Sequence, residues 1–521
     1  MKISKNHINL ISCLFIFSFS FIINIYVGSL GVFPIDTFIH YDNGFRILLG
    51  EHPVKDYWIV HGFLIDYIQA FFFKFFGNNW NSYILHSSIF NSFIALFSFF
   101  IFNLLNLKKK TAFLLSVSVG ILAYPVSGTP FLDLHSSYFS LIGIYFGIIA
   151  VYKNKSIYWF GTSFFLCLAF FSKQVPAAYT IIGISMINFY LSAKKRNIYI
   201  VFYYVAGAGL FLLFLTLLLL INKIPFDDFI LQIFLFPQSI GTSRYENYSL
   251  GLKNVFWDYK LIYLSFIPIL FLNLKEIYKK NYINSKKFNI FLIFTTLVIT
   301  SIFHQIYTKN QVYIFFLIPL CSGFAIFYSN LITSDYKKKI NFLIIILCLV
   351  ATFKYHERFN INRKFHELNY VTTSNSINGS NIHNKLKGIN WISPYFKNPQ
   401  EEIDILTISL KILKEENKTK MMITQYNFFS SLLEEKLFSP SRTFDSISYP
   451  KKNTRYYIKY KNHLTSIIKK NKIEKIFILE PFSKYDINEI IFNYISLNCF
   501  KQKKINQHLL ELEIKNCRDL L

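Results

Sequence analysis

The residues best suited to chemistry gather in one polar stretch, Gly31 to Trp80, which follows the first long apolar segment. The stretch is rich in Asp and His, although the chain has only 29 Asp and Glu against 55 Lys and Arg. Asp36 comes first, soon after the apolar segment. A carboxylate there can take a proton from a hydroxyl group or help to bind a metal ion. Asp36 also suits the N-cap of a helix that starts at Thr37, and the two roles are compatible.

Two short amphipathic runs follow in the same stretch. The first, residues 37–49, ends at Gly50, and the second, residues 63–76, ends at Gly77. Glycine commonly closes a helix, so both runs are predicted to be helical. Asp42 lies in the first run and is interpreted either as a further candidate catalytic acid or as a solvated acid of an amphipathic helix. Polar groups between two helices at a bilayer surface are suited to meet a lipid-linked substrate.

A second acidic element, Asp133-Leu134-His135, precedes a later apolar run. On an extended segment, alternate residues point the same way, so Asp133 and His135 would share a metal ion or one face of a substrate. The alternative is that both residues cap a helix that begins at Ser136.

These features resemble the first external loop of the GT-C glycosyltransferases, polytopic enzymes that take a sugar from a polyprenyl-phosphate carrier. The matching elements, in order, are an Asp after the first span, a Gly closing a short helix, a Pro-x-x-Asp-Tyr element and a helix ending in Phe-Gly: Asp36, Gly50, Pro53, Asp56, Tyr57, Phe76 and Gly77. The resemblance includes the protein mannosyltransferases and the lipid A aminoarabinose transferases, and it covers the chain to about Phe353. It implies that Asp36 is the central catalytic carboxylate.

The resemblance also implies the roles of other residues. Lys173 follows Ser172 where family members have a Thr/Ser-Lys pair, which predicts phosphate binding, and the alternative is a snorkelling Lys. Asp133 and His135 match the second acidic motif of the family, as metal or acceptor ligands. Further candidates lie in two external loops, where ordinary solvated charges are the alternative: Arg244, His304 and Lys309 for the donor phosphate, and Glu246 for a metal ion or the acceptor. A divalent cation (Mg²⁺, Mn²⁺ or Zn²⁺) is an open expectation.

Apolar runs long enough to span a bilayer must position these residues. The mean hydropathy is +0.34 and 53% of the residues are hydrophobic, which over this length is typical of a multi-span membrane protein. About eleven transmembrane helices are predicted. The runs are residues 9–28, 83–105, 111–126, 136–152, 157–171, 175–192, 198–221, 259–274, 288–304, 311–331 and 340–354.

Lysine and arginine clusters between these runs set the expected orientation. The clusters lie in residues 108–110, 153–155, 194–196, 275–287 and 337–339, after every second run. Cytoplasmic loops carry such clusters, so the N-terminus is predicted to be cytoplasmic. The loops with the candidate site residues, and the part after the last run, are then external, in a bacterial inner membrane.

The chain is predicted to divide into a membrane domain (1–354), a polar linker (355–400) and a soluble α/β domain (401–521). Helix-like runs (403–414, 428–436, 456–470) and strand-like runs (420–425, 475–480) alternate in the last part. Cys499 and Cys517 are the two cysteines of this part, and an oxidising compartment favours a disulfide between them. The alternative is two free, buried thiols.

The expected function is inverting transfer of a sugar from a polyprenyl-phosphate carrier to a glycan, lipid or protein acceptor. A transporter or flippase of lipid-linked sugars, or an O-antigen polymerase or ligase, is the alternative. A transporter places charges at mid-membrane, whereas here they cluster at the ends of the runs. The net charge of +26 favours anionic headgroups or phosphates as partners, although a compositional bias explains it equally well. The chain has no motif that indicates nucleic-acid binding.

Reporter fusions test this orientation. Fusions at Lys109 and Lys195 should report the cytoplasm, because both residues lie in basic loops, and a fusion at Asn381 should report the outside. A cytoplasmic signal at Asn381 would remove the basis for an external site.

Overall fold

The computed structural model describes residues 5–246, 251–278, 282–308, 313–331, 336–445, 447–480 and 487–515, without the side chains of 5–8 and 243–246. The chain forms two compact units. Unit 1 comprises Met1–Gly28, Ile84–Thr216 and Arg244–Phe365, and unit 2 comprises Ser29–Tyr83, Leu217–Ser243 and His366–Leu521.

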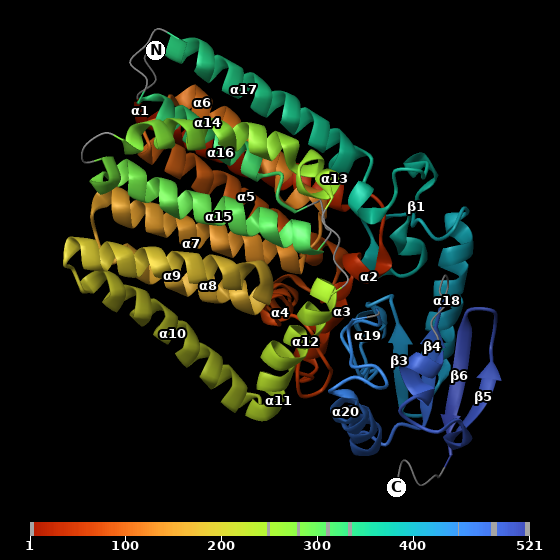
Figure 1. Ribbon diagram of the computed structural model, residues 1–521. Helices are drawn as coiled ribbons and strands as arrows, with labels where there is room; N and C mark the ends of the chain where they lie inside the picture. The colour runs from red at the N-terminus through yellow and green to blue at the C-terminus, as the bar shows by residue number, and fades with distance from the viewer. Residues whose placement is uncertain are drawn as a thin grey trace. The chain divides into compact units, whose positions relative to one another are not determined.

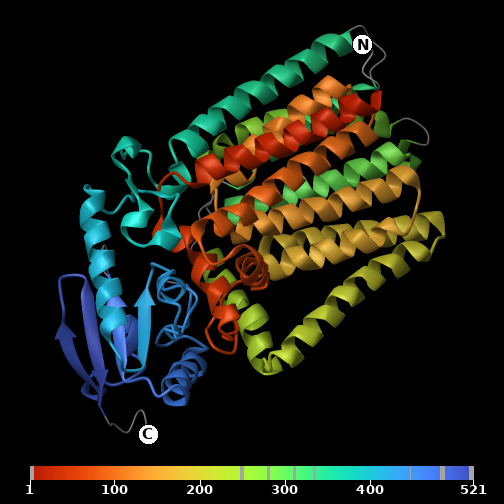
Figure 2. The same cartoon turned by 180° about the vertical axis from the view of Figure 1, so that it is seen from behind.

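Unit 1 is a bundle of long apolar helices that run side by side (Figures 1 and 2). The helices are α1 (Lys5–Gly28), α5 (Trp80–Leu104), α6 (Lys109–Leu122), α7 (Leu132–Lys153), α8 (Tyr158–Ser172), α9 (Gln174–Lys195), α10 (Tyr199–Ile221), α14 (Lys260–Ile277), α15 (Lys286–Thr308), α16 (Leu317–Ser329) and α17 (Tyr336–Tyr355). A helix therefore lies at each predicted apolar run.

Within the described residues, eight helical segments are long and apolar enough to cross a membrane. The chain is thus a helical membrane protein. α8 and α16 are shorter apolar helices, and α6 has 14 residues, so the crossing number of about eleven stays a prediction. In α10, Leu213 and Phe214 each expose more than half of their surface, as is typical of a lipid-facing helix.

Buried amides and close backbone contacts join the helices of unit 1. The Asn91 side chain donates to the carbonyls of Ser20 (2.7 Å) and Gly120 (2.9 Å), and its oxygen accepts the Tyr124 N–H. Such polar contacts hold helices together where lipid supplies no hydrophobic driving force. Gly28 lies so close to Gly128 that a Cβ on Gly28 would come within 2.7 Å of the Gly128 carbonyl oxygen.

Unit 2 contains a four-stranded sheet in the order β3-β4-β6-β5 within the described residues. The strands are β3 (Lys420–Thr424), β4 (Lys475–Leu479), β5 (Phe500–Lys504) and β6 (Leu509–Ile514). β3 and β4 pair in parallel, and β6 pairs antiparallel with both β4 and β5. The strands predicted at 420–425 and 475–480 are confirmed, and residues 502–513 lie in a hairpin.

Helices cover both faces of this sheet. α20 (Tyr457–Lys470) packs on the face that carries Met421 and Ile423 of β3. α18 (Pro399–Glu415) covers the other face, which Figure 2 shows in front. Alternate residues of a strand point to opposite faces, so β3 and β4, buried on both sides, read as continuous apolar runs.

The first polar stretch of the sequence also belongs to unit 2. Its helices are α2 (Pro34–Thr37), α3 (Ile39–Leu48) and α4 (Leu64–Phe76). The two predicted glycine stops are confirmed, because Gly50 and Gly77 follow α3 and α4 with φ of +81° and +86°. Glycine adopts these angles at little cost.

Short elements complete the two units. The remaining helices and helical turns are η1 (Tyr124–Val126), α11 (Phe226–Ile230), η2 (Leu231–Leu235), α12 (Phe236–Glu246), α13 (Leu252–Val255), η3 (Trp257–Tyr259), η4 (Tyr282–Asn284), η5 (His356–Ile361), η6 (Lys364–His366), η7 (Thr373–Asn375), η8 (Gly379–Asn381), η9 (Asn384–Leu386), α19 (Phe429–Leu433), η10 (Asn488–Phe492) and η11 (Leu497–Cys499).

Residues 355–400 are more ordered than the predicted linker. They hold several helical turns and a two-stranded sheet of β1 (Ile377–Asn378) and β2 (Asn390–Trp391). Trp391 is fully buried, and its ring stacks on Phe38 with ring centroids 5.7 Å apart. The buried Trp explains the order, because a large aromatic side chain stabilises the segment that carries it.

Asp42 and Asp66 of the first stretch are buried, which corrects the interpretation of Asp42 as a solvated residue. Asp42 is 9% exposed and accepts the Ser431 backbone N–H at 2.8 Å. Asp66 is fully buried and bonds to Arg442 and to His40, each at 2.6 Å. These acids join the first stretch to the C-terminal part of unit 2.

Asp42 should make the stability of unit 2 depend on pH. Burial raises the pKa of Asp42 to about 6. Its contribution to stability is therefore fully present below the pKa of an unfolded Asp, ~4, and is lost as the pH rises through about 6. Asp42→Asn can still accept the Ser431 N–H, so the variant should unfold at a higher temperature than the parent at pH 8, with no such gain at pH 4.

Thermal unfolding of the detergent-solubilised protein at both pH values measures this difference. Asp404→Asn, at an exposed acid on α18, is the control and should not change the pH dependence. An equal effect of Asp42→Asn at both pH values would contradict the prediction.

Candidate functional site

A buried ion pair at the start of α7 is the centre of the candidate site in unit 1. The Lys173 ammonium donates to both oxygens of Asp133, at 2.8 and 2.7 Å. The Nε2 atom of His304, in α15, lies 3.9 Å from the same carboxylate. The Asp133 and Lys173 side chains are 4% and 12% exposed. Two charges and an imidazole thus meet where α7, α8, α9 and α15 end or begin.

A break between α8 and α9 turns Lys173 toward this carboxylate. Lys173 has an extended backbone (φ −155°, ψ 129°), and so has Val175 (φ −116°, ψ 127°). Pro176 favours this conformation, because a residue before proline avoids the helical region. The Ser136 hydroxyl of α7 donates to the Lys173 carbonyl at 3.1 Å, which ties the break to α7.

This arrangement leaves Lys173 able to bind an anion. An ammonium group has three N–H donors, and two are directed at Asp133. Within the described residues, the third N–H has no partner. A buried carboxylate needs a cation, so Asp133 holds Lys173 in one position. The cluster can therefore present a fixed positive donor to a phosphate or carboxylate at the ends of the helices.

A second group of polar residues lies beside it and joins the predicted residue His135 to His86 and Tyr124, which the sequence did not predict. His135 Nε2 is 3.0 Å from His86 Nε2, and its Nδ1 bonds the Tyr124 hydroxyl. All three side chains are fully buried. Each imidazole can donate from one nitrogen and accept at the other, so the three residues form a chain along which a proton can move. His86 could have been found from the sequence, because it lies within an apolar span, where ionisable residues are rare and often functional.

Asp133 and His135 do not share a face, which corrects the extended segment expected from the sequence. α7 begins at Leu132, so both residues lie in its first turn. Residues two apart on a helix point to different sides. Asp133 contacts Lys173, and His135 contacts His86. Among the described residues, no group of three or more His, Cys, Asp or Glu side chains is arranged to hold a metal ion. The divalent cation expected from the sequence therefore stays a prediction.

Asp36 lies in unit 2, half-buried as the third residue of α2. The N-cap positions of α2 and α3 are Phe33 and Phe38, so Asp36 is not the N-cap of either helix. Tyr395 lies near Asp36: burial, and the charges of Glu367, Asp36 and Glu402, raise the pKa of the Tyr395 phenol. Asp36 is therefore one of several acids around this ring.

Four predicted residues fall outside what the structure describes. Arg244 and Glu246 are in α12, but their side chains are outside the described part, as are Lys309 and Cys517 entirely. Cys499 is buried and disulfide-bonded. The pairing of Cys499 with Cys517, and the roles of the other three residues, stay predictions.

No protein-family model matches the chain, and no curated protein matches its sequence. The function is therefore argued from the residues and their geometry.

Removing one partner of the buried pair should be far more costly than removing both. Lys173→Met leaves the Asp133 carboxylate buried without its cation, which costs about 3–5 kcal/mol. The double variant Asp133→Leu/Lys173→Met removes both charges and should recover much of that loss. Thermal unfolding of the two single variants and the double variant measures the coupling.

Lys195→Met, at the exposed last residue of α9, is the control and should cost less than about 1 kcal/mol. If the losses of the two single variants simply add, the two charges are not coupled in the folded protein.

Proposed function

We propose that the chain is an inverting glycosyltransferase of the GT-C type. It would move a sugar from a polyprenyl-phosphate carrier to a glycan, lipid or protein acceptor at the external face of the membrane. The observation that supports this proposal most is the buried cluster of Asp133, Lys173 and His304, which offers a fixed cation at the ends of apolar helices. The ends of membrane-spanning helices lie near the bilayer surface, where the headgroup of a lipid carrier lies.

The residues at which the chain leaves unit 1 and returns to it lie close together. Gly28, where the chain leaves unit 1, packs against Gly128 and Ile84, and Ile84 is where it returns. Asn24 also donates to Ser87 and to the Gly128 carbonyl, at 3.0 and 3.1 Å. Gly28, Ile84 and Gly128 thus lie close together within unit 1.

In the proposed reaction, Lys173 neutralises the departing phosphate. Its third N–H bonds a phosphate oxygen, while Asp133 keeps the ammonium in place and His304 supplies a further donor. The bond between the anomeric carbon and the phosphate oxygen breaks, and the carrier leaves with both electrons. A charged donor fixed in a site of low dielectric stabilises that charge more than water does.

Asp36 is the proposed general base. It takes the proton of the acceptor hydroxyl as that oxygen attacks the anomeric carbon from the side opposite to the phosphate. Attack from the opposite side inverts the configuration of the sugar. Asp36 lies among the acids whose charges act on Tyr395, together with Glu367 and Glu402.

The charge distribution favours an enzyme over a transporter. In the helices of unit 1, every Asp, Glu, Lys and Arg of the described residues lies in the first or last turns. Transporters place ionisable residues near the middle of the bilayer, at the substrate path. The helix interiors here carry mostly apolar side chains, and the buried His86 lies near the start of α5.

Asp36→Asn tests the proposal. The asparagine keeps the size of the side chain but cannot accept a proton near neutral pH, so turnover should fall by about 10²–10⁴-fold. The assay incubates the purified protein with a panel of polyprenyl-phosphate sugars and measures release of the carrier, at matched expression and thermal stability.

Asp56→Asn is the control for this assay. The Asp56 side chain is 15% exposed, lies in the same segment and forms an ion pair with the exposed Lys470. Its variant should keep near-normal turnover. Normal turnover of Asp36→Asn would exclude the base, and release of no carrier from any donor by the parent protein would exclude the reaction.

A further inference from the structure

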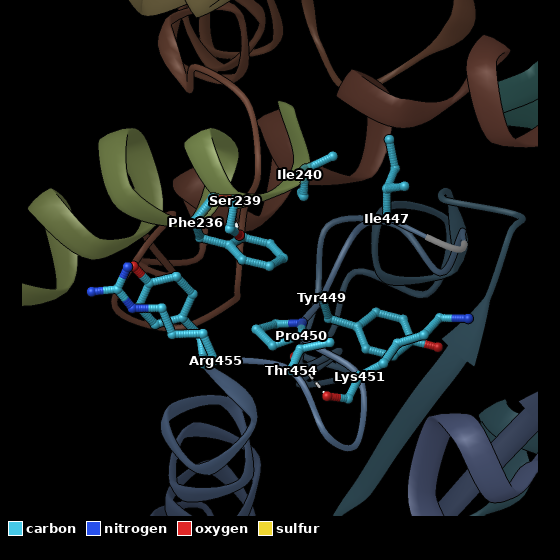
Figure 3. A pocket seen from close by; sticks show the side chains of 10 residues that line it. Phe236, Ser239, Ile240, Ile447, Tyr449, Pro450, Lys451, Thr454 and Arg455 are labelled. Carbon is cyan, nitrogen blue, oxygen red and sulfur yellow. Dashed lines mark hydrogen bonds between the residues drawn. The ribbon is translucent and has the colours of Figure 1, made fainter. Parts of the chain in front are cut away.

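Unit 2 contains a cavity of about 330 Å³ between α12 and the segment that precedes α20 (Figure 3). Phe236, Ser239 and Ile240 of α12 line one side, and Tyr449, Pro450 and Thr454 face them across the space. Ligand sites of proteins begin at about 300 Å³, so the cavity has room for one ring-sized group. The proposed transfer reaction does not use any of these residues.

The walls of the cavity are rigid and largely apolar. Phe236 and Tyr449 are 4% and 5% exposed, so their rings are fixed by the core behind them. The Phe236 ring meets the Tyr456 ring edge to face, with centroids 6.3 Å apart. Tyr449 in turn stacks on Tyr460 of α20, with centroids 5.2 Å apart. Fixed aromatic walls suit the flat apolar face of a sugar ring, at little entropic cost.

One cation at the cavity is left for a ligand. Lys451 is already paired with Glu489 at 2.5 Å. Arg455 is exposed, its guanidinium lies 5.4 Å from the centre of the Tyr456 ring, and it has no carboxylate partner among the described residues. A guanidinium binds a carboxylate or a phosphate with two parallel hydrogen bonds. The sequence has no Asp or Glu from 446 to 473, so nothing nearby along the chain competes for it.

Two hydroxyl groups add acceptors for sugar hydroxyls. The Ser239 hydroxyl donates to the Phe236 carbonyl at 2.7 Å, and the Thr454 hydroxyl donates to the Lys451 carbonyl at 2.6 Å. Because each proton is engaged inside the protein, the lone pairs of both oxygens are left to accept hydrogen bonds. The two residues lie on opposite sides of the cavity (Figure 3).

We infer that this cavity binds one sugar unit of an anionic saccharide, with its carboxylate or phosphate on Arg455 and its ring against the aromatic walls. The inference goes beyond the proposed reaction and does not depend on it. A phosphoglycerol lipid headgroup offers the same phosphate but has no ring face to place against Phe236 and Tyr449, so the walls favour the saccharide.

Binding to the full-length, detergent-solubilised protein tests the inference. Three probes are compared: oligogalacturonate, glucose 6-phosphate and maltotriose, of which the last is neutral. Saturation-transfer NMR and calorimetry measure the binding of each probe. The two anionic probes should bind more tightly than maltotriose. Arg455→Gln should weaken binding of the anionic probes by about ten- to a hundredfold, since a hydrogen bond to a charged group is lost. It should change maltotriose binding little.

Two further variants separate the cavity from general charge effects. Lys452→Gln removes the same charge three residues away, at an exposed position that does not line the cavity, and should leave binding unchanged. Ser239→Phe fills the cavity and should abolish binding of all three probes. Thermal unfolding checks that each variant is folded.

Three results would overturn the inference. The first is no binding of either anionic probe by the folded parent protein. The second is an equal loss of binding in Arg455→Gln and Lys452→Gln, which would indicate non-specific attraction to basic residues. The third is Arg455-dependent binding to nanodiscs of anionic lipid with no saccharide binding, which would assign Arg455 to a lipid headgroup.

Discussion

Burial of the Asp133 carboxylate among apolar helices is the constraint on which unit 1 depends. A buried carboxylate is tolerated only with a cation and hydrogen bonds close by, and Lys173 supplies both from the break between α8 and α9. The break must then stay next to α7, which the bond from Ser136 to the Lys173 carbonyl ensures. One pair of charges thus fixes where three helices end and leaves one N–H for a ligand.

The same requirement shapes unit 2, where the buried acids of the first polar stretch find their partners near the end of the chain. Asp66 bonds to Arg442, which also donates to the Gly62 carbonyl at 2.9 Å. Asp42 accepts the backbone N–H of Ser431. These partners lie more than 350 residues from the acids along the chain, yet neither acid is stable in the interior without them. The first stretch and the C-terminal part therefore fold together.

Local patterns in the sequence predict what local forces decide. Apolar runs of about 20 residues locate the helices, Gly50 and Gly77 locate the ends of α3 and α4, and KIFIL locates β4. The partners of buried charges are distant in the sequence. The pairing of Lys173 with Asp133 could therefore not be predicted, although each residue was a candidate. The extended conformation expected at Asp133 was wrong, because three residues are too few to distinguish an extended segment from the first turn of a helix. α7 begins at Leu132 and includes them. The described residues assign no role to Arg244 or Lys309.

The net charge of the cluster suggests a reason for the buried ion pair other than stability. Apolar residues of similar size often replace a buried ion pair without loss of stability, so stability alone does not explain Asp133 and Lys173. With His304 neutral, the cluster has no net charge. In the proposed reaction, the donor is a phosphodiester with one negative charge, and the released carrier is a monoester with up to two. The Lys173 ammonium attracts that second charge, and the His304 Nε2 atom lies 3.9 Å from Asp133 in the same cluster. The cluster would then bind the leaving group more strongly than the donor, which is the difference that accelerates a reaction.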